Sequence, residues 1–139
     1  TADCDENKNA ISGALKGLGW SEEKENEFIS TLDIPCLNEV ILDDAELLEI
    51  YLNQGETLIQ ELEKSERESA PEKSLHVLHK LAGSSGSCGF SGFQSQCSGL
   101  ENRLRLEPQL LASNDLSSVK EAFQDIREFI HSVNQYLQL

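Results

Sequence analysis

The stretch Leu75–Leu104 reads LHVLHKLAGSSGSCGFSGFQSQCSGLENRL, and the spacing of its apolar residues decides the fold class. Apolar side chains recur at steps of three and four residues, which is the period of a helix with one buried face. The first such stripe is Leu75, Leu78 and Ala82, and the second is Phe93, Cys97, Leu100 and Leu104. The stretch therefore predicts two successive helices, the second opening near Ser91.

Two short polar patterns indicate where these helices begin. Ser69-Ala-Pro-Glu72 has the form of a capping box with proline in the first turn, and Ser91-Gly-Phe-Gln94 has the form of a second box. Pro108 should close the helix that follows Ser91, because proline cannot continue a helix.

Long helices are predicted on both sides of this pair. The upstream helix should run from about Asp44 to Arg67, with acidic residues at its positive N-terminal end. Its inward residues are Leu48, Tyr51, Leu58 and Leu62. The downstream helix should begin near residues 113–115, with a stripe formed by Leu116, Val119, Phe123, Ile126, Ile130, Val133 and Leu137. The sequence thus predicts an all-α fold, an antiparallel four-helix bundle with short connections.

Residues 1–32 are interpreted as a linker or capping helices, and residues 33–139 as the bundle. Additional short helices are expected from about Asp5 to Lys16, after Ser21, and near Pro35. Gly17, Gly19 and the polar run SEEKENE argue against tight packing in this region.

Composition excludes several classes of function. Lys and Arg number 11 against 25 Asp and Glu, so a formal charge of −14 repels nucleic-acid phosphates and anionic lipid headgroups. No apolar run approaches the roughly 18 to 20 residues that span a bilayer, so we expect no membrane insertion. The N-terminus lacks the features of a signal peptide, and its Thr start suggests a piece of a longer protein. Four widely spaced cysteines without a CxxC pair favour reduced thiols and a cytoplasmic location.

Three glycines interrupt the helix that carries the first stripe. Gly83, Gly86 and Gly89 would each cost a helix interior roughly 1 kcal/mol relative to alanine. Such departures from local preference are expected where something approaches the backbone closely. At 100° per residue, His79 lies on the flank of the helix beside Gly83, so its imidazole should stand clear on the surface as a nucleophile. The alternative is that the helix ends at Ala82 and a flexible loop follows.

At this point the segment resembles a known family. His79-Lys80-Leu81-Ala82-Gly83-Ser84-Ser85, followed by Gly89, Cys97 and Leu100-Glu101, is similar to the histidine phosphotransfer pattern His-x-Leu-Lys-Gly-Ser-Ser with a later Gly and a downstream Leu-Glu. The resemblance implies that His79 is phosphorylated and that Gly83 makes room for the incoming aspartyl phosphate. Lys80, Ser84 and Arg105 would help to place the phosphate. Ala82 stands where the family has a lysine, so another cation must supply that charge.

The resemblance also implies partners and context. The chain would accept a phosphoryl group from one receiver domain and pass it to another, with Mg²⁺ supplied by the receiver and no cofactor in this domain. It would act as a monomer when isolated. The segment LDIPCLNEVILDDAELLEIYL resembles the opening of such domains at the C-terminal end of bacterial hybrid sensor kinases, so the chain could also be the cytoplasmic tail of a membrane-bound sensor.

Other interpretations of the same residues remain open. His76, His79, Cys88 and Cys97 could be imagined as a zinc site, although their spacing fits no compact zinc template. His76 could be the phosphorylated residue, but Lys80 then stands where a glycine is needed. An autonomous ATP-dependent kinase is not expected without a nucleotide-binding loop. The main alternative function is a helical scaffold that binds a receiver domain or a partner helix without chemistry.

Overall fold

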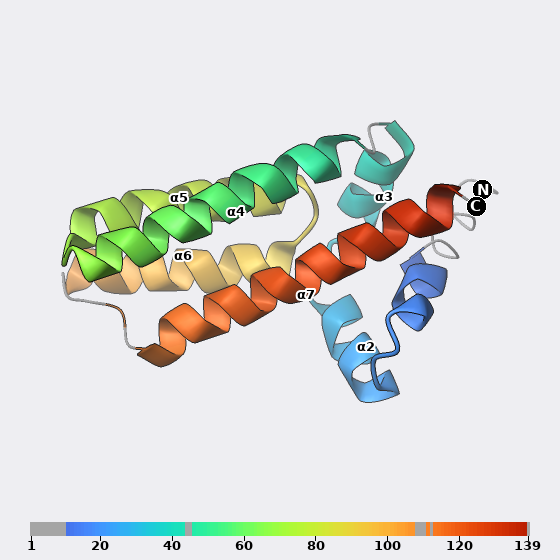
Figure 1. Ribbon diagram of the computed structural model, residues 1–139, viewed down its shortest axis with the longest axis horizontal. Helices are drawn as coiled ribbons and strands as arrows, with labels where there is room; N and C mark the ends of the chain where they lie inside the picture. The colour runs from blue at the N-terminus through green and yellow to red at the C-terminus, as the bar shows by residue number, and fades with distance from the viewer. Residues whose placement is uncertain (1–10, 44–45, 108–110, 112, 139) are drawn as a thin grey trace.

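The computed structural model describes residues 11–43, 46–107, 111 and 113–138, and these form helices and no strand. Four long helices make up the bundle: α4 (Glu46–Arg67), α5 (Pro71–Ser87), α6 (Ser91–Leu106) and α7 (Ser113–Gln138). Each runs opposite to the one before it, and α5 packs mainly against α6 and α4 (Figure 1). The prediction of an all-α antiparallel bundle is confirmed.

The apolar stripes meet in one continuous core. Phe90 and Phe129 are the largest side chains that are almost fully enclosed. Tyr51 stacks on Phe90, with ring centroids 5.4 Å apart. A Cβ at Gly55 would come within 2.6 Å of the Phe123 ring, so this glycine lets α4 approach α7 closely. No described helix is long and apolar enough to cross a membrane.

Both predicted capping boxes are wrong, although α5 and α6 begin where they were expected. The N-cap of α5 is Ala70 and that of α6 is Phe90, and neither side chain makes a capping hydrogen bond. Ser69 has a φ of 54° in the tight turn after α4, which removes its hydroxyl from the capping position. Ser91 is already helical, and its hydroxyl donates to the Thr31 carbonyl at 3.2 Å. Pro108 lies outside the described residues.

Gly89 also differs from its predicted place, because α5 ends at Ser87. Gly89 lies in the turn before α6 with a φ of +93°, a conformation that favours glycine. A Cβ there would come 2.8 Å from the Leu37 amide nitrogen and 3.0 Å from the Asp33 carbonyl oxygen. Glycine is therefore needed at position 89 because the chain turns tightly there and lies close to the backbone of Asp33 and Leu37. Gly83 and Gly86 are helical as predicted.

The segment before the bundle is folded onto its end. Residues 11–17 are helical, followed by α2 (Glu22–Ser30) and α3 (Ile34–Asp43), which bears out the helices expected after Ser21 and near Pro35. The part of the first expected helix before residue 11 lies outside the described residues. The expectation of loose packing is wrong for the first described helix, because Ile11, Ala14 and Leu15 are buried in the core. It holds only in part for α2, which has no buried residue although Phe28 packs on the Phe129 ring.

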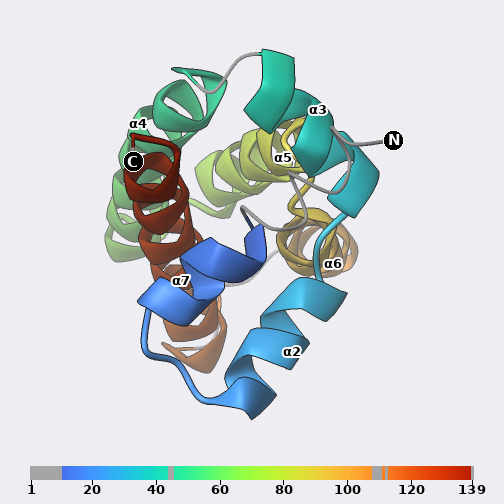
Figure 2. The ribbon, with the colours of Figure 1, turned by 90° about the vertical axis from the view of Figure 1, so that its right-hand side faces the viewer.

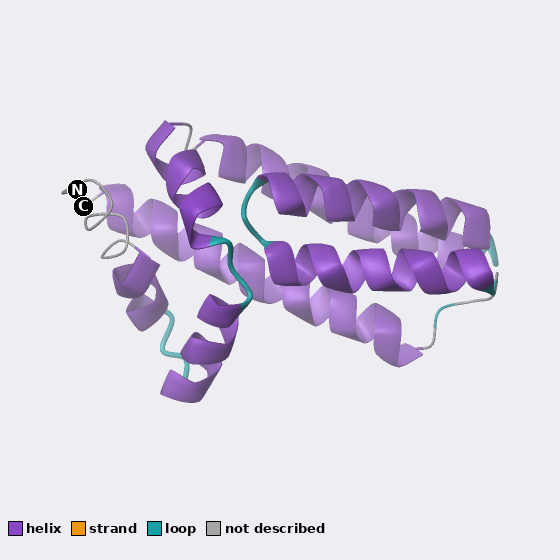
Figure 3. Cartoon of the chain, turned by 180° about the vertical axis from the view of Figure 1, so that it is seen from behind, coloured by secondary structure: helices purple, strands orange, loops and turns teal. Residues whose placement is uncertain are grey.

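Backbone hydrogen bonds join this segment to the turn between α5 and α6. The Asp33 amide donates to the Gly89 carbonyl, and the Gly92 amide donates to the Thr31 carbonyl, both at 2.8 Å. Figure 2 shows α2 and α3 gathered at this end of the bundle, and Figure 3 shows α5 and α6 side by side with the turn that joins them. The described part of the N-terminal segment, residues 11–43, leaves the middle of α5 and α6 uncovered (Figure 3).

Candidate functional site

His79 lies in the middle of α5, on a face that the bundle does not cover. Its side chain is 70 % exposed, whereas Leu78 and Leu81 on the opposite side of the helix are fully buried. The buried residues recur at steps of three and four and fix the rotation of the helix, so the flank that carries His79 must face outward. The sequence placed His79 on this flank correctly.

The imidazole is held by a residue of the neighbouring helix. Nδ1 of His79 lies 3.0 Å from Oε1 of Glu101 on α6, and only 8 % of the Glu101 side chain is exposed. Glu101 also pairs with Arg105, so its carboxylate is ionised and can only accept hydrogen bonds. Nδ1 of His79 must therefore carry the proton of this hydrogen bond. The lone pair of the neutral ring is then on Nε2, which is the nitrogen available for nucleophilic attack.

Arg105 completes this arrangement from the next turn of α6. Its guanidinium donates to the same Oε1 of Glu101 at 2.6 Å, while 58 % of the arginine side chain remains exposed. The cation offsets the cost of keeping a carboxylate in a poorly solvated position. Arg105 therefore reaches His79 through Glu101, rather than standing as a free cation.

Space beside His79 is provided by Gly83, one turn further along α5. A Cβ built at Gly83 would meet nothing within 4 Å, so its missing side chain leaves open surface and no internal packing requirement. Glycine is needed at position 86 for a different reason, because a Cβ on Gly86 would come 2.5 Å from the side-chain amide of Gln94 on α6. Of the two glycines in α5, only Gly83 leaves open room on the outer surface.

Lys80 and Ser84 lie on the flank of α5 that faces α4. They line a shallow cleft with Asn53, Gln54, Thr57 and Leu58. The Ser84 hydroxyl donates to the Lys80 carbonyl at 3.0 Å, so it is used within the helix. Lys80 forms no ion pair among the described residues. The structure thus brings Arg105 to His79 through Glu101, and leaves Lys80 and Ser84 on the flank that faces α4.

Glu101 is the residue of this cluster to which the sequence had given no function. It is one of four buried polar or charged residues in the described chain, beside the buried Leu100 and Leu104. The sequence did hold one sign of a role for Glu101, because it is an acidic residue beside an apolar stripe and Arg105 follows four positions later. The partner of that acid could not be identified from spacing within α6, because His79 is 22 residues earlier on another helix.

The imagined zinc site is not formed. No group of three or more potential metal-ligating side chains comes together in the described part of the chain. Cys88 and Cys97 are buried, whereas His76 is exposed. Burial raises the pKa of Cys88 to about 11 and that of Cys97 to about 12. Both thiols are therefore protonated and unreactive near neutral pH.

Comparison with known proteins gives a family assignment. The model of the Hpt domain family matches residues 46–135, more than half of the chain, and includes α4, α5, α6 and most of α7. No significant match was found among curated proteins or among solved structures. Hpt domains act in histidine phosphotransfer within phosphorelays, and they interact with receiver domains in two-component signalling. With its four-helix bundle and the exposed histidine on α5, this chain belongs to the Hpt domain family.

Proposed function

We propose that this protein accepts a phosphoryl group on Nε2 of His79 from the aspartyl phosphate of a receiver domain and passes it to another receiver domain. The observation that carries the proposal is the combination of an exposed imidazole with a carboxylate that fixes its Nδ1 proton. A bundle that served only as a scaffold would not need to orient a surface histidine in this way.

The transfer is an in-line displacement. The Nε2 lone pair of His79 attacks phosphorus, the new N–P bond forms, and the P–O bond to the aspartate breaks, so that the aspartate leaves as a carboxylate. The ring becomes cationic because its proton stays on Nδ1, and the Glu101 carboxylate at 3.0 Å stabilises that charge. The reverse sequence delivers the group to the next receiver.

In this proposal the positive charge around the phosphoryl group comes from cations other than the family lysine. Ala82, which stands in place of the family lysine, is buried on the core face of α5 and offers no charge. Arg105 is linked to His79 through Glu101. Lys80 is the next residue after His79 and is also exposed. In this proposal Arg105 and Lys80 attract the phosphoryl oxygens, while Gly83 and Ser84 shape the surface that the receiver covers.

The reaction depends mainly on positioning and on charge stabilisation, and the receiver supplies much of both. Its acidic pocket would bring the Mg²⁺, so this domain requires no cofactor of its own. We propose that the isolated domain is a monomer and acts in the cytoplasm, alone or as the C-terminal domain of a hybrid sensor kinase. The partner would cover the exposed surface of α5 and α6 around His79.

The deciding experiment measures phosphoryl transfer from a panel of phosphorylated receiver domains, with Mg²⁺, to the wild type and to two variants. His79→Gln should take no label. His76→Gln should be labelled like the wild type, because His76 is exposed and pairs with no carboxylate among the described residues. The label should be acid-labile and alkali-stable. Binding of a receiver without any labelling would favour the scaffold function, and loss of label in His76→Gln alone would refute the assignment to His79.

A further inference from the structure

A groove lies between α2 and the adjoining faces of α6 and α7, away from the histidine. Figure 1 shows α2 projecting from the side of the bundle next to α7. The groove has a volume of about 670 Å³, within the range of ligand-binding sites. Its apolar lining consists of the half-buried Phe28 and Ala122 and of the edges of three buried side chains, Phe90, Phe93 and Ile126. None of the residues around His79 contributes to it, so the groove is a separate feature of the surface.

One wall of this groove is not part of the matched family region. The match begins at residue 46, whereas α2 ends at Ser30. At its C-terminal end α2 approaches α6 so closely that a Cβ at Gly92 would come 2.5 Å from that of Thr31. Further along, Phe28 packs on Phe129 with ring centroids 5.1 Å apart. The helix is thus fixed at specific points, and the groove is an addition of this chain to the bundle.

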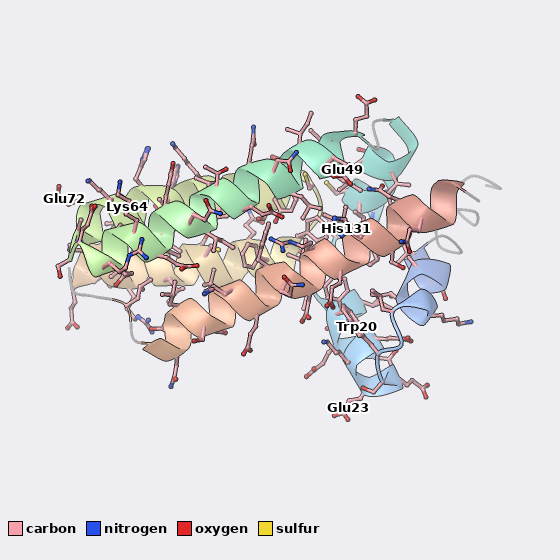
Figure 4. All side chains as sticks on the ribbon, in the orientation of Figure 1. Trp20, Glu23, Glu49, Lys64, Glu72 and His131 are labelled. Carbon is pink, nitrogen blue, oxygen red and sulfur yellow. The ribbon has the colours of Figure 1, made fainter. Side chains whose placement is uncertain are left out.

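The free charges on the rim are negative. Lys24 is already matched, because its Nζ lies 3.2 Å from Oδ1 of Asp125 and 4.3 Å from the centre of the Trp20 ring. Glu23 and Glu27, which are one turn apart on α2, form no ion pair with the described residues. Figure 4 labels Glu23 on α2, together with Trp20. An occupant should therefore combine apolar and positively charged groups.

We propose that this groove binds a basic amphipathic helix of a partner protein. Its apolar side chains would lie against the half-buried Phe28 and Ala122, and two lysines or arginines one turn apart would meet Glu23 and Glu27. The 9 residues of α2 span roughly 13 Å, a length that accepts anchors spaced at i, i+3 or i+4, and i+7. A net charge of −14 opposes nucleic acid and anionic lipid as occupants.

Binding here would leave the phosphotransfer surface free. Glu101 and Arg105 lie on the side of α6 that faces His79, whereas Phe93 and Gln96 of the same helix face the groove. A partner held in the groove could therefore remain bound while a receiver domain docks on α5. In this way the N-terminal segment would give the domain a second, independent attachment point.

Trp20 provides a direct readout, because it is the only tryptophan and its ring lies 5.3 Å from that of Phe28, a groove residue. The probe is a synthetic 15-residue helical peptide with leucines at i, i+3, i+4 and i+7 and lysines on both flanks. Its control has glutamate in place of every lysine. The basic peptide should change Trp20 fluorescence saturably, and the acidic peptide should bind at least about tenfold more weakly, because like charges oppose docking.

Two charge-reversed proteins separate the groove from general attraction. Glu23→Lys/Glu27→Lys should weaken binding of the basic peptide about tenfold or more. Glu46→Lys/Glu61→Lys changes the net charge equally at exposed positions of α4 and should bind like the wild type. Ala122→Phe, which fills the floor of the groove, should also abolish binding while the circular dichroism spectrum shows that the helices remain.

Equal weakening in the two charge-reversed proteins, or equal binding of the two peptides, would overturn the proposal. So would NMR shift changes that gather around His79 instead of around Phe28 and Ala122. The His79→Gln protein should bind the peptide as the wild type does. Failure of the relay function would therefore leave the groove proposal intact, and the reverse is equally true.

Discussion

Nδ1 of His79 on α5 and Oε1 of Glu101 on α6 are 3.0 Å apart, so a buried carboxylate of one helix orients an exposed imidazole of another. This contact decides which ring nitrogen faces the solvent. It also places a negative charge where positive charge develops when a phosphoryl group joins Nε2. Because α5 and α6 pack closely along their length, the contact depends on the relative register of the two helices.

Replacement of Glu101 should slow phosphotransfer without removing the nucleophile. Glu101→Ala loses the acceptor of the Nδ1 proton. We expect the rate to fall about 10- to 100-fold, by analogy with the loss of groups that orient metal-binding histidines. Nitrogen-15 NMR of the His79 ring should show a loss of preference for the Nδ1–H tautomer. Glu107→Ala, an exposed change at the end of the same helix, is the control. An unchanged tautomer in Glu101→Ala would contradict the assignment.

Arg105 should matter both to the reaction and to the fold. Its side chain is 58 % exposed, but that of Glu101 is only 8 % exposed, so Arg105→Gln leaves a poorly solvated carboxylate without its cation and should cost about 1–3 kcal/mol in unfolding free energy. Phosphotransfer should slow severalfold, because the variant cannot neutralise Glu101 or attract the phosphoryl oxygens. Arg103→Gln is the matched control, since Arg103 pairs with Asp115 on α7. Equal rates in the two variants would show that Arg105 has no part in transfer.

Gly83 and Gly55 should respond in opposite ways to an added methyl group. Gly83→Ala meets open space in a helix and should raise the unfolding free energy by up to about 1 kcal/mol. Gly55→Ala must displace the Phe123 ring and should lower that free energy by roughly 1–3 kcal/mol. Chemical denaturation measures both changes. A larger change, Gly83→Leu, should remain folded but lose labelling by the receiver, and normal labelling would argue against docking over Gly83.

Stability should decrease in alkali as the buried thiols titrate. Burial raises the pKa of Cys88 to about 11 and of Cys97 to about 12, above the ordinary value of 9.0. Above pH 9 the unfolded chain therefore binds fewer protons than the folded protein, and the unfolding free energy falls through this window. Below about pH 8 neither thiol should contribute a slope. Denaturation at pH 8, 9 and 10 would measure this, and a free energy that is constant up to pH 10 would contradict it.

Much of the fold could be predicted from local pattern. The stripe Val119, Phe123, Ile126, Ile130 and Val133 is fully buried along α7, as its steps of three and four required. The helix starts were found for the wrong reason at Ser69 and Ser91, because a capping box is recognised from side-chain types while its formation depends on the backbone of the preceding turn. The backbone of the turns before α5 and α6 is set by the way the helices on either side of each turn pack together.

The candidate site divides in the same way. The amino-acid sequence by itself determined that His79 is exposed beside Gly83, since the helical period and the burial of Leu78 and Leu81 leave that flank outside. Only the tertiary structure decided that Glu101 holds Nδ1 and that Gly89 is a close contact with α3 rather than a helical residue. Periodicity fixes the rotation of each helix about its own axis, but contacts between helices depend on their register and separation, which packing of the whole core sets.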